Sequence, residues 1–448
     1  MDMAHRHTLP TTMLQFVSNS IRIHYMFKQI HLLIFALLIA WSCNVDQVIT
    51  EPTPPTPPAE TPEESIPALK IPYVSVIGTD KPIVMELGDT VTFIATVTET
   101  GLETKYSWNL DRKWVSNSLE YRYIPKEIGE HDIQFSAKNI DGADTVNFIV
   151  TVTIPKDMYK RQKSELSKAD WDRVYEYTPA PGQFINETKT GGYTGEERNY
   201  TDAIEYAERR MREDKFVSLG GFGGYIVVGF DHSIENIEGY DLGIKGNSFD
   251  GSSEPGVVWV MQDENGDGMP NDTWYELKGS ETGKPNTIQN YSVTYFKPAE
   301  PGKPVQWEDN LGNSGEIDYL KQYHPQDYYY PAWIQSESYT LTGTRLEPRN
   351  YDKSGNGTLW ILPHYDWGYA DNFSSIDRLS EDDNFNAATN ANHFDIANAI
   401  DNSGNPVQLE FVDFIKVQCA LNIKCGWIGE TSTEVFGFFD YSMTQNEI

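Results

Sequence analysis

Cysteine is scarce in this sequence, which has only three in 448 residues: Cys43, Cys419 and Cys425. If Cys43 is modified, only Cys419 and Cys425 are left to pair, and in an oxidising compartment they would close a small loop. Two free thiols are the alternative. The spacing by itself does not decide between a disulfide and two thiols.

Catalytic and nucleotide-binding motifs are also missing. The chain has no GxSxG, no HExxH and no phosphate-binding loop, and the glycine-rich residues 220–224 lead into a strand pattern without a following Lys-Ser/Thr. Carboxylate pairs such as Glu430/Glu434 and Asp382/Asp383 could serve a glycosidase, but 66 acidic residues make chance pairs unavoidable. The sequence therefore favours a protein that is not an enzyme.

Basic residues are few, since 35 Lys and Arg stand against 66 Asp and Glu and give a formal net charge of −31. This balance argues against a nucleic-acid partner and against binding to an anionic lipid surface by charge. We expect an exported protein with a soluble, self-repelling surface.

A hydrophobic run long enough to span a membrane is absent from the N-terminal region, where the apolar residues 32–40 are too few for a transmembrane helix. These residues follow a basic start at Met26 and precede Cys43, which is the pattern of a secretory signal. Residues 40–43 resemble a bacterial lipobox, in which Cys43 would carry the lipid; an ordinary signal peptide is the alternative. We assign residues 1–42 to an N-terminal extension and lipoprotein signal peptide, and expect membrane attachment only through the lipid.

The remaining chain is predicted to be all-β, in two domains behind a tether. Residues 43–67 are rich in Pro, Thr and Glu and form the tether. Residues 68–155 alternate apolar and polar side chains in short runs, which predicts an immunoglobulin-like sandwich with Trp108 in its core. The runs GDTVTF, YSWNL and GEHDIQFSAKNIDGADT resemble a PKD-type domain, although residues 109–112 replace its usual WDFGDG turn. Such a module is expected to be a spacer.

The C-terminal half is predicted to be one large jelly-roll-like β-sandwich, residues 216–448, after a connecting and partly helical segment at residues 156–215. Short β-branched and aromatic runs recur between Gly-rich loops, for example at residues 225–230 and 257–261.

One loop has the spacing of a calcium site. In DENGDGMPND, oxygen-bearing side chains stand at alternate positions and a glycine follows, but Trp274 occupies the twelfth position where a helix-loop-helix site needs Glu. An ordinary acidic turn is the alternative. The ligands expected for calcium are Asp263, Asn265, Asp267 and Asp272.

Longer motifs carry a family resemblance. The runs LGGFGGYIVVGFDHSI, GYDLGIKGNSF, SSEPGVVWVMQDENGDG and HFDIANAID resemble Bacteroidota cell-surface lipoproteins with an N-terminal PKD-like domain. The resemblance covers most of residues 68–443. It implies a lipid-anchored protein on the outer membrane, exposed at the cell surface. Because proteins of this kind also occur beside cobalamin-uptake systems, it further suggests corrinoid capture with an outer-membrane transporter as partner.

Aromatic residues in two loops are the candidate ligand-binding surface. Sugars and corrin rings both stack on such side chains. A core position is the alternative for any one of them. His364 and His393, with Asp366 and Asp395, would be a transition-metal site only if the fold gathered them, and structural histidines are the more common outcome. The expected ligand-binding residues are Tyr329, Trp333, His364, Tyr365, Trp367, Tyr369 and Phe373.

Three functions fit these observations. The first is non-catalytic capture of an extracellular nutrient, either a corrinoid or a glycan. The second is hydrolysis of a surface polysaccharide, which requires two carboxylates in a cleft and at least one raised pKa. The third is a calcium-stabilised adhesion or structural module.

Overall fold

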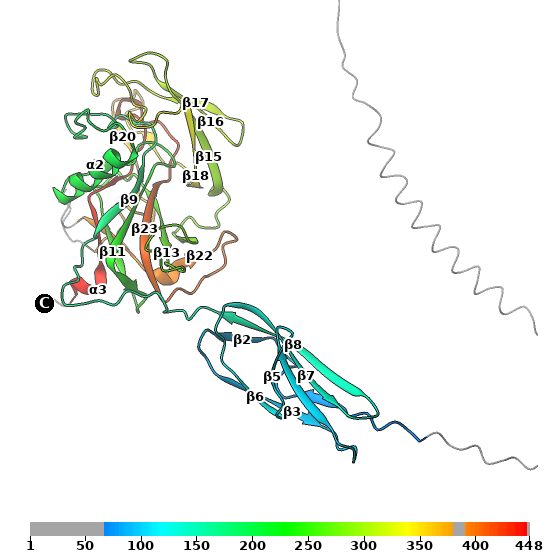
Figure 1. Cartoon of the computed structure of the whole chain (residues 1–448). Helices are drawn as coiled ribbons and strands as arrows, with labels where there is room; N and C mark the ends of the chain where they lie inside the picture. Colours follow the sequence, from blue (N-terminus) through cyan, green and yellow to red (C-terminus); the bar gives the residue numbers. More distant parts are fainter. Residues whose placement is uncertain (1–66, 380–389, 446–448) are drawn as a thin grey trace, which may run out of the picture. The chain divides into compact units, whose positions relative to one another are not determined.

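A computed structural model describes residues 67–379 and 390–445 (Figure 1). Two β-sandwich regions follow one another along the chain, each with its own hydrophobic core. The predicted all-β fold class is therefore confirmed. No helix in the described part of the chain is long and apolar enough to cross a membrane. Cys43 and the predicted tether lie outside the described residues.

The first sandwich confirms the immunoglobulin-like prediction. Its smaller sheet has the order β1-β3-β6 and its larger sheet the order β2-β8-β7-β4-β5. Buried side chains alternate with exposed ones along β8, so that one face of the strand packs inward. Trp108 is fully buried and its indole nitrogen donates to the carbonyl of Ser118 at 2.9 Å. The strands are β1 Val74–Val76, β2 Ile83–Glu86, β3 Val91–Val97, β4 Lys105–Leu110, β5 Lys113–Ser116, β6 Glu120–Tyr123, β7 Gly129–Lys138 and β8 Ala143–Thr153.

The large domain is built on a six-stranded antiparallel sheet with the order β22-β14-β13-β23-β11-β9. In Figure 1 these strands run through the middle of the domain. Its central strands are nearly continuous apolar runs, because both of their faces are covered. The strands are β9 Arg173–Thr178, β11 Tyr225–Glu235, β13 Gly256–Met261, β14 Trp274–Leu277, β22 Ala399–Ile400 and β23 Phe411–Cys419.

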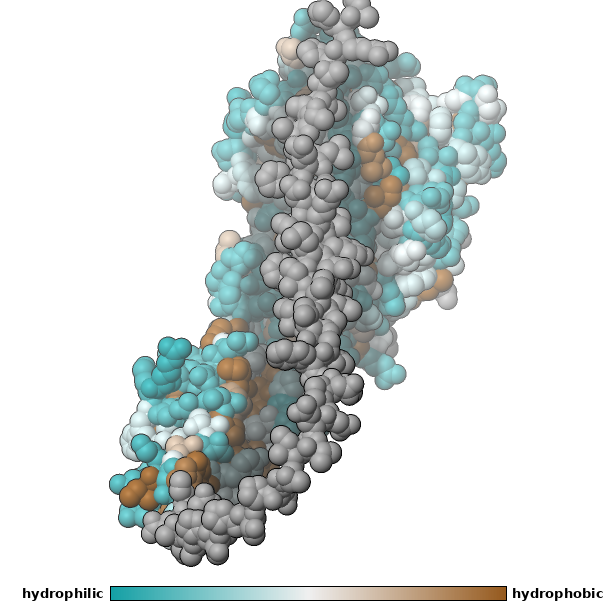
Figure 2. All heavy atoms as spheres, turned by 90° about the vertical axis from the view of Figure 1, so that its right-hand side faces the viewer, coloured by the Kyte–Doolittle hydropathy of each residue, from teal (hydrophilic) through white to brown (hydrophobic). Residues whose placement is uncertain are grey.

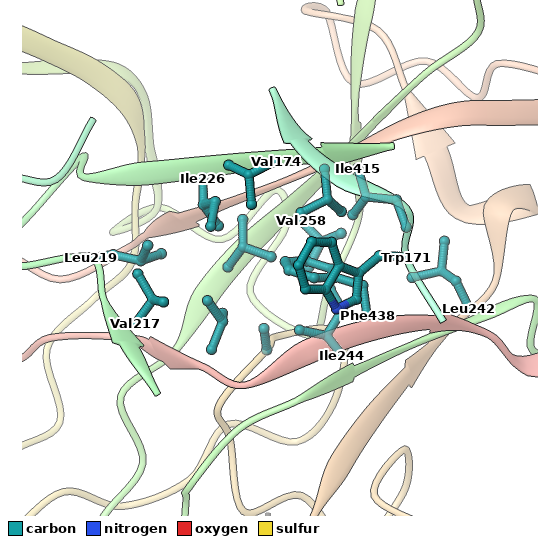
Figure 3. Packing of buried hydrophobic residues seen from close by; sticks show 14 of the residues in the cluster. Trp171, Val174, Val217, Leu219, Ile226, Leu242, Ile244, Val258, Ile415 and Phe438 are labelled. Carbon is teal, nitrogen blue, oxygen red and sulfur yellow. The ribbon is translucent and has the colours of Figure 1, made fainter. Parts of the chain in front are cut away.

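A second layer packs on the inner face of this sheet. It consists of the sheet β21-β12-β25 and the pair β10-β24. Figure 3 shows Ile226, Val258 and Ile415 of the six-stranded sheet pointing toward Ile244 and Phe438 of this layer. The strands are β10 Val217–Ser218, β12 Leu242–Lys245, β21 Ala391–Phe394, β24 Glu434–Val435 and β25 Gly437–Asp440.

A four-stranded sheet, ordered β17-β16-β15-β18, adds a further core that contains Tyr291, Tyr295, Tyr329 and Tyr330. A two-stranded pair, β19 with β20, lies in the loop region that follows β18. The remaining elements are β15 Ile288–Phe296, β16 Val305–Asp309, β17 Ser314–Ile317, β18 Ser338–Arg345, β19 Tyr351–Asp352, β20 Trp360–Ile361, η1 Ile396–Asn398, η2 Gly426–Ile428 and α3 Tyr441–Thr444.

Residues 156–215 are part of the large domain, which corrects the predicted boundary at residue 216. The segment supplies β9, the edge strand that pairs with β11, and the helix α2 (Tyr200–Arg212). Ala203, Ala207 and Met211 of α2 are buried in the same core as the six-stranded sheet. The sequence did not predict that this segment contributes to the core, because its composition is charged and only one face of the strand and of the helix is apolar.

The surface agrees with the acidic composition. In the coloured part of Figure 2, hydrophilic residues are more frequent than hydrophobic ones, which gather in a few patches. Apolar atoms make up a large share of the surface of folded proteins, so these patches by themselves indicate no binding site.

Candidate functional site

Four of the predicted ligand-binding aromatics belong to the core. Tyr329, Tyr365 and Tyr369 are 1–2% exposed and Trp333 is 5% exposed. Tyrosine hydroxyl groups among them are engaged inside the protein: Tyr365 Oη donates to the carbonyl of Glu347 at 2.6 Å, and Tyr329 Oη to that of His324 at 2.8 Å. These rings cannot stack on a ligand from outside, so the prediction is wrong for them. Loop composition placed them at the surface, whereas the long loops of this domain carry cores of their own.

The other three predicted residues are accessible but do not form one surface. His364 is exposed, and its carbonyl accepts from Arg349 Nη1 at 3.1 Å. Phe373 is half-buried with the Arg378 guanidinium over its ring, 4.0 Å from the centroid. Trp367 is half-buried and lines a cavity of about 400 Å³. Only Trp367 is therefore retained in the candidate site.

The cavity beside Trp367, called here the Trp367 pocket, is assembled from segments far apart in the sequence. The loop after β20 brings Trp367, β21 brings His393, and η1 brings Asn398. Its lining contains both apolar and polar residues. The apolar group is Tyr240, Leu277, Trp367, Ile376 and Phe394; the polar group is Lys278, Asp377, His393, Asp395 and Asn398.

His393 presents an acceptor nitrogen. Its Nδ1 lies 2.9 Å from the carbonyl oxygen of Asp377, which can only accept, so Nδ1 carries the proton. Burial lowers the pKa of His393, which keeps the imidazole neutral at pH 7. Nε2 has no hydrogen-bond partner within residues 67–379 and 390–445 and carries a lone pair. It can accept a hydrogen bond from a hydroxyl group or bind a metal.

The two acidic residues of the pocket, Asp377 and Asp395, differ in how many of their carboxylate oxygens accept hydrogen bonds within the protein. Asp377 is 2% exposed; its Oδ2 accepts from Gly368 N at 2.5 Å and its Oδ1 from Asn392 Nδ2 at 2.9 Å. Burial raises the pKa of Asp377, and these hydrogen bonds oppose the rise. Asp395 caps η1, with Oδ1 accepting from Ala397 N, and its Oδ2 accepts no hydrogen bond from residues 67–379 or 390–445. This oxygen suits recognition of a hydroxyl group better than acid–base catalysis by two carboxylates.

The predicted calcium loop uses its side chains as turn acceptors. Asp263 accepts from Gly266 N at 2.7 Å and from Gly268 N at 2.9 Å, one bond on each carboxylate oxygen. Asp267 Oδ1 accepts from Met269 N at 2.8 Å. The four predicted ligands therefore belong to one hydrogen-bonded turn, with Asn265 Nδ2 donating to Asp272 at 3.2 Å. Calcium binding by this loop stays a prediction.

In the described part of the chain, His364 and His393 do not come together as a metal site, and Cys419 and Cys425 do not form a disulfide. His364 is exposed and His393 is buried, and within the described residues neither belongs to a group of three or more potential ligands with all ligand atoms within 4.8 Å. Cys419 and Cys425 are both buried free thiols. This resolves the question that spacing left open, in favour of thiols.

Sequence reasoning missed most of the pocket. Tyr240, Ile376, Asp377 and Asn398 carry no local motif, and they come together only because β12, β14, β21 and η1 end near the loop that holds Trp367. The signal that was available was the glycine and aspartate content around Trp367, which indicated a loop.

Comparisons with known proteins add little. No protein-family model and no curated protein matches the chain. Solved structures that align with it include a carbohydrate-binding module of the β-sandwich superfamily (11% identity, 83% of this chain and 99% of that chain, TM-score 0.20) and a SusE-like protein (9%, 82% and 96%, TM-score 0.15). Fibronectin(III)-like modules of Clostridium thermocellum align over 21% of this chain and 52% of theirs, at 15% identity and a TM-score of 0.18. Similarities this low do not establish a shared fold, so none of them enters the argument below.

Proposed function

We propose that this protein binds a carbohydrate without catalysis and that the Trp367 pocket is the binding site. The observation that carries the proposal is a half-buried tryptophan that lines a cavity of about 400 Å³ together with polar residues. A sugar ring has an apolar face that packs on an aromatic ring and hydroxyl groups that need hydrogen-bond partners. The lining includes both kinds of group, because Trp367 offers an aromatic ring and His393 and Asp395 offer hydrogen-bond acceptors.

Cavity size favours a sugar over a corrinoid. Pockets for organic ligands span about 300–1,000 Å³, and this one lies at the small end of that range. One or two sugar rings fit such a volume, whereas a corrin ring with its side groups is much larger. His393 Nε2 is a suitable ligand for cobalt in principle, but its side chain is only 7% exposed and is poorly placed to meet a large macrocycle.

The cellular setting of the proposal comes from the sequence. A lipid on Cys43, followed by the tether at residues 43–67 and a spacer domain, would present the pocket outside the outer membrane. A carbohydrate bound there would be delivered to an outer-membrane transporter. The calcium loop at residues 263–272 would serve as a structural brace.

Calorimetric titration of the purified protein with a panel of host oligosaccharides and with cyanocobalamin tests this function. We expect an oligosaccharide to bind, and Trp367→Ala to weaken its binding by at least about tenfold, because a central aromatic contact is lost. Trp427→Ala is the matched control, since Trp427 is 46% exposed and does not line the pocket.

An equal loss of affinity in both tryptophan variants, or unchanged affinity in Trp367→Ala, would show that the oligosaccharide binds outside the Trp367 pocket. Binding of cyanocobalamin alone would replace the carbohydrate proposal with corrinoid capture.

A further inference from the structure

We infer that Glu254, Asp371 and Glu434 form a binding site for a divalent cation of the calcium type. One carboxylate oxygen from each residue lies within 4.8 Å of those of the other two, and these three are the one such group in the described part of the chain. Glu254 precedes β13, Asp371 follows the loop of Trp367, and Glu434 begins β24. We call this group the carboxylate triad.

Two residues of the triad are buried and Glu254 is half-buried, and no positive charge in the described part of the chain compensates them. Asp371 is 1% exposed and Glu434 is 3% exposed. Within residues 67–379 and 390–445, no Lys, Arg or His nitrogen forms an ion pair with any of the three carboxylates. Adjacent buried carboxylates repel one another and are costly unless a proton or a cation lies between them.

The fold holds Asp371 in a fixed orientation. Its Oδ1 accepts from Asn247 N at 2.9 Å and its Oδ2 from Glu434 N at 3.0 Å. Its own carbonyl accepts from Glu254 N at 3.0 Å, so the backbones of the two residues are joined as well. Three chain segments are therefore tied around Asp371, which preorganises its carboxylate as a ligand.

An unpartnered oxygen points to a missing ligand. Among the described residues, no N–H or hydroxyl group donates to the enclosed Glu434 Oε1, although buried carboxylate oxygens are normally satisfied. The side chain of Glu254 can hydrogen-bond to Glu434 only when one of the two carboxyl groups is protonated, so either a proton or a cation must lie between them. The side-chain amide of Asn247 faces the same place, with one of its polar atoms 3.0 Å from Asp371 Oδ1 and 3.2 Å from Oδ2. With its nitrogen toward Asp371, this amide donates; with its oxygen toward Asp371, it offers a fourth ligand oxygen beside three carboxylates.

Oxygen donors of this kind select a hard cation. Calcium takes six to eight oxygen ligands at about 2.3–2.6 Å, in flexible geometry that includes carboxylates, amide oxygens and waters. The triad and Asn247 supply up to four groups, and water would complete the shell. Glu254 and Asn247 are half-buried, whereas Asp371 and Glu434 are buried. The loop at residues 263–272 is a separate candidate for a cation, and the experiment below distinguishes it from the triad.

A cation bound to the triad would stabilise the loop that holds Trp367 in the proposed binding site. Asp371 lies four residues after Trp367, and Ala370 between them forms an isolated bridge with Gly256 at the start of β13. The ion would therefore fix the loop of Trp367 to β13 and β24.

The test is thermal unfolding of the chelator-treated protein with and without added Ca²⁺. We expect saturating Ca²⁺ to raise the melting temperature by on the order of 5 °C. Glu434→Gln should abolish this rise and should be at least as stable as wild type without Ca²⁺, because it removes one of the repelling charges. That second readout separates loss of the ion from failure to fold.

Asp267→Asn, in the loop at residues 263–272, is the matched control and should keep the full rise. If Ca²⁺ no longer raised the melting temperature of Asp267→Asn but still raised that of Glu434→Gln, the ion would belong to that loop and the inference would be overturned. No rise in the wild-type protein would also overturn it and would show that the triad carries protons instead.

Discussion

At the scale of single residues, the most constrained charged group is His232. Its Nδ1 lies 2.6 Å from Asp231 and its Nε2 lies 2.9 Å from Asp440, so both ring nitrogens donate and the imidazole is charged. Burial opposes this charge, but the two carboxylates raise the pKa of His232 above its usual value. Burial likewise acts to raise the pKa of Asp440, yet hydrogen bonds from His232, Ser442 and Lys163 lower it to about 2.

The pair predicts a stability maximum in mildly acidic solution. Because the pKa of Asp440 is lowered, its contribution is present above about pH 4 and is lost as the pH falls toward about 2. Because the pKa of His232 is raised, its contribution is complete below about pH 6.5 and is lost as the pH rises through the higher folded value. Urea unfolding between pH 2 and pH 9 should show both losses, and His232→Gln should remove the loss on the alkaline side.

Asp440 and Asp231 provide a comparison on the same imidazole. Asp440→Asn should lower the free energy of unfolding by about 3–5 kcal/mol at pH 6, since it breaks a fully buried ion pair. Asp231 is 36% exposed, so Asp231→Asn should cost only about 0–1 kcal/mol. Equal costs would show that burial does not set the strength of these pairs.

At the scale of elements, β9 and α2 decide where the large domain begins. Helix α2 is capped by Asn199, whose side chain accepts from Thr201 N and Asp202 N, and its inner face joins the main core. The core residues contributed from this segment are Trp171, Val174, Tyr177, Ile185, Ala203, Tyr206, Ala207 and Met211.

A chain that begins at residue 216 should therefore fail to fold, whereas one that begins at residue 156 should fold. Removing one large core side chain costs about 2–5 kcal/mol, and the total stability of a domain is only about 5–15 kcal/mol. Near-ultraviolet circular dichroism and urea unfolding of the two chains would measure this. A cooperative transition for the shorter chain would show that the segment is dispensable.

At the scale of the whole molecule, two separate cores imply two folding units. The core around Trp108 contains only residues between Val74 and Val152, and the main core contains only residues from Trp171 onward. We therefore expect each core to unfold in its own transition.

Trp108→Ala should destabilise the first sandwich alone, by about 3–5 kcal/mol, because it empties a fully buried site. In a urea titration, one transition should move to lower urea while the other stays in place. Trp114 in the same sandwich is 65% exposed, and Trp114→Ala should leave both transitions nearly unchanged. Movement of both transitions in Trp108→Ala would mean that the units unfold together.

Local patterns were sufficient for much of the fold. Alternation along residues 91–97 and β-branched runs at residues 225–230 and 257–261 predicted strands that the structure contains. The period of the side chains fixes which face of a strand is buried, and this information is present in a few consecutive residues. The edge strand β9 was not predicted, because its residues mix charged and apolar side chains and its pairing depends on partners distant in the sequence.

The candidate sites were less predictable than the fold. Trp367 was named from its loop composition, but the same reasoning placed Tyr365 and Tyr369 at a surface, and both are buried. An aromatic residue in a loop is equally compatible with a core and a binding face, because only the surrounding chain decides which atoms water can reach.

The sequence by itself determined the all-β class, the immunoglobulin-like first sandwich, the acidic surface and the absence of familiar catalytic motifs. Each of these depends on composition or on neighbours along the chain. Only the tertiary structure brought His393 to Trp367 and gathered Glu254, Asp371 and Glu434, which are 117 and 63 positions apart along the chain. Pairing of distant strands set these distances, and no local pattern records it.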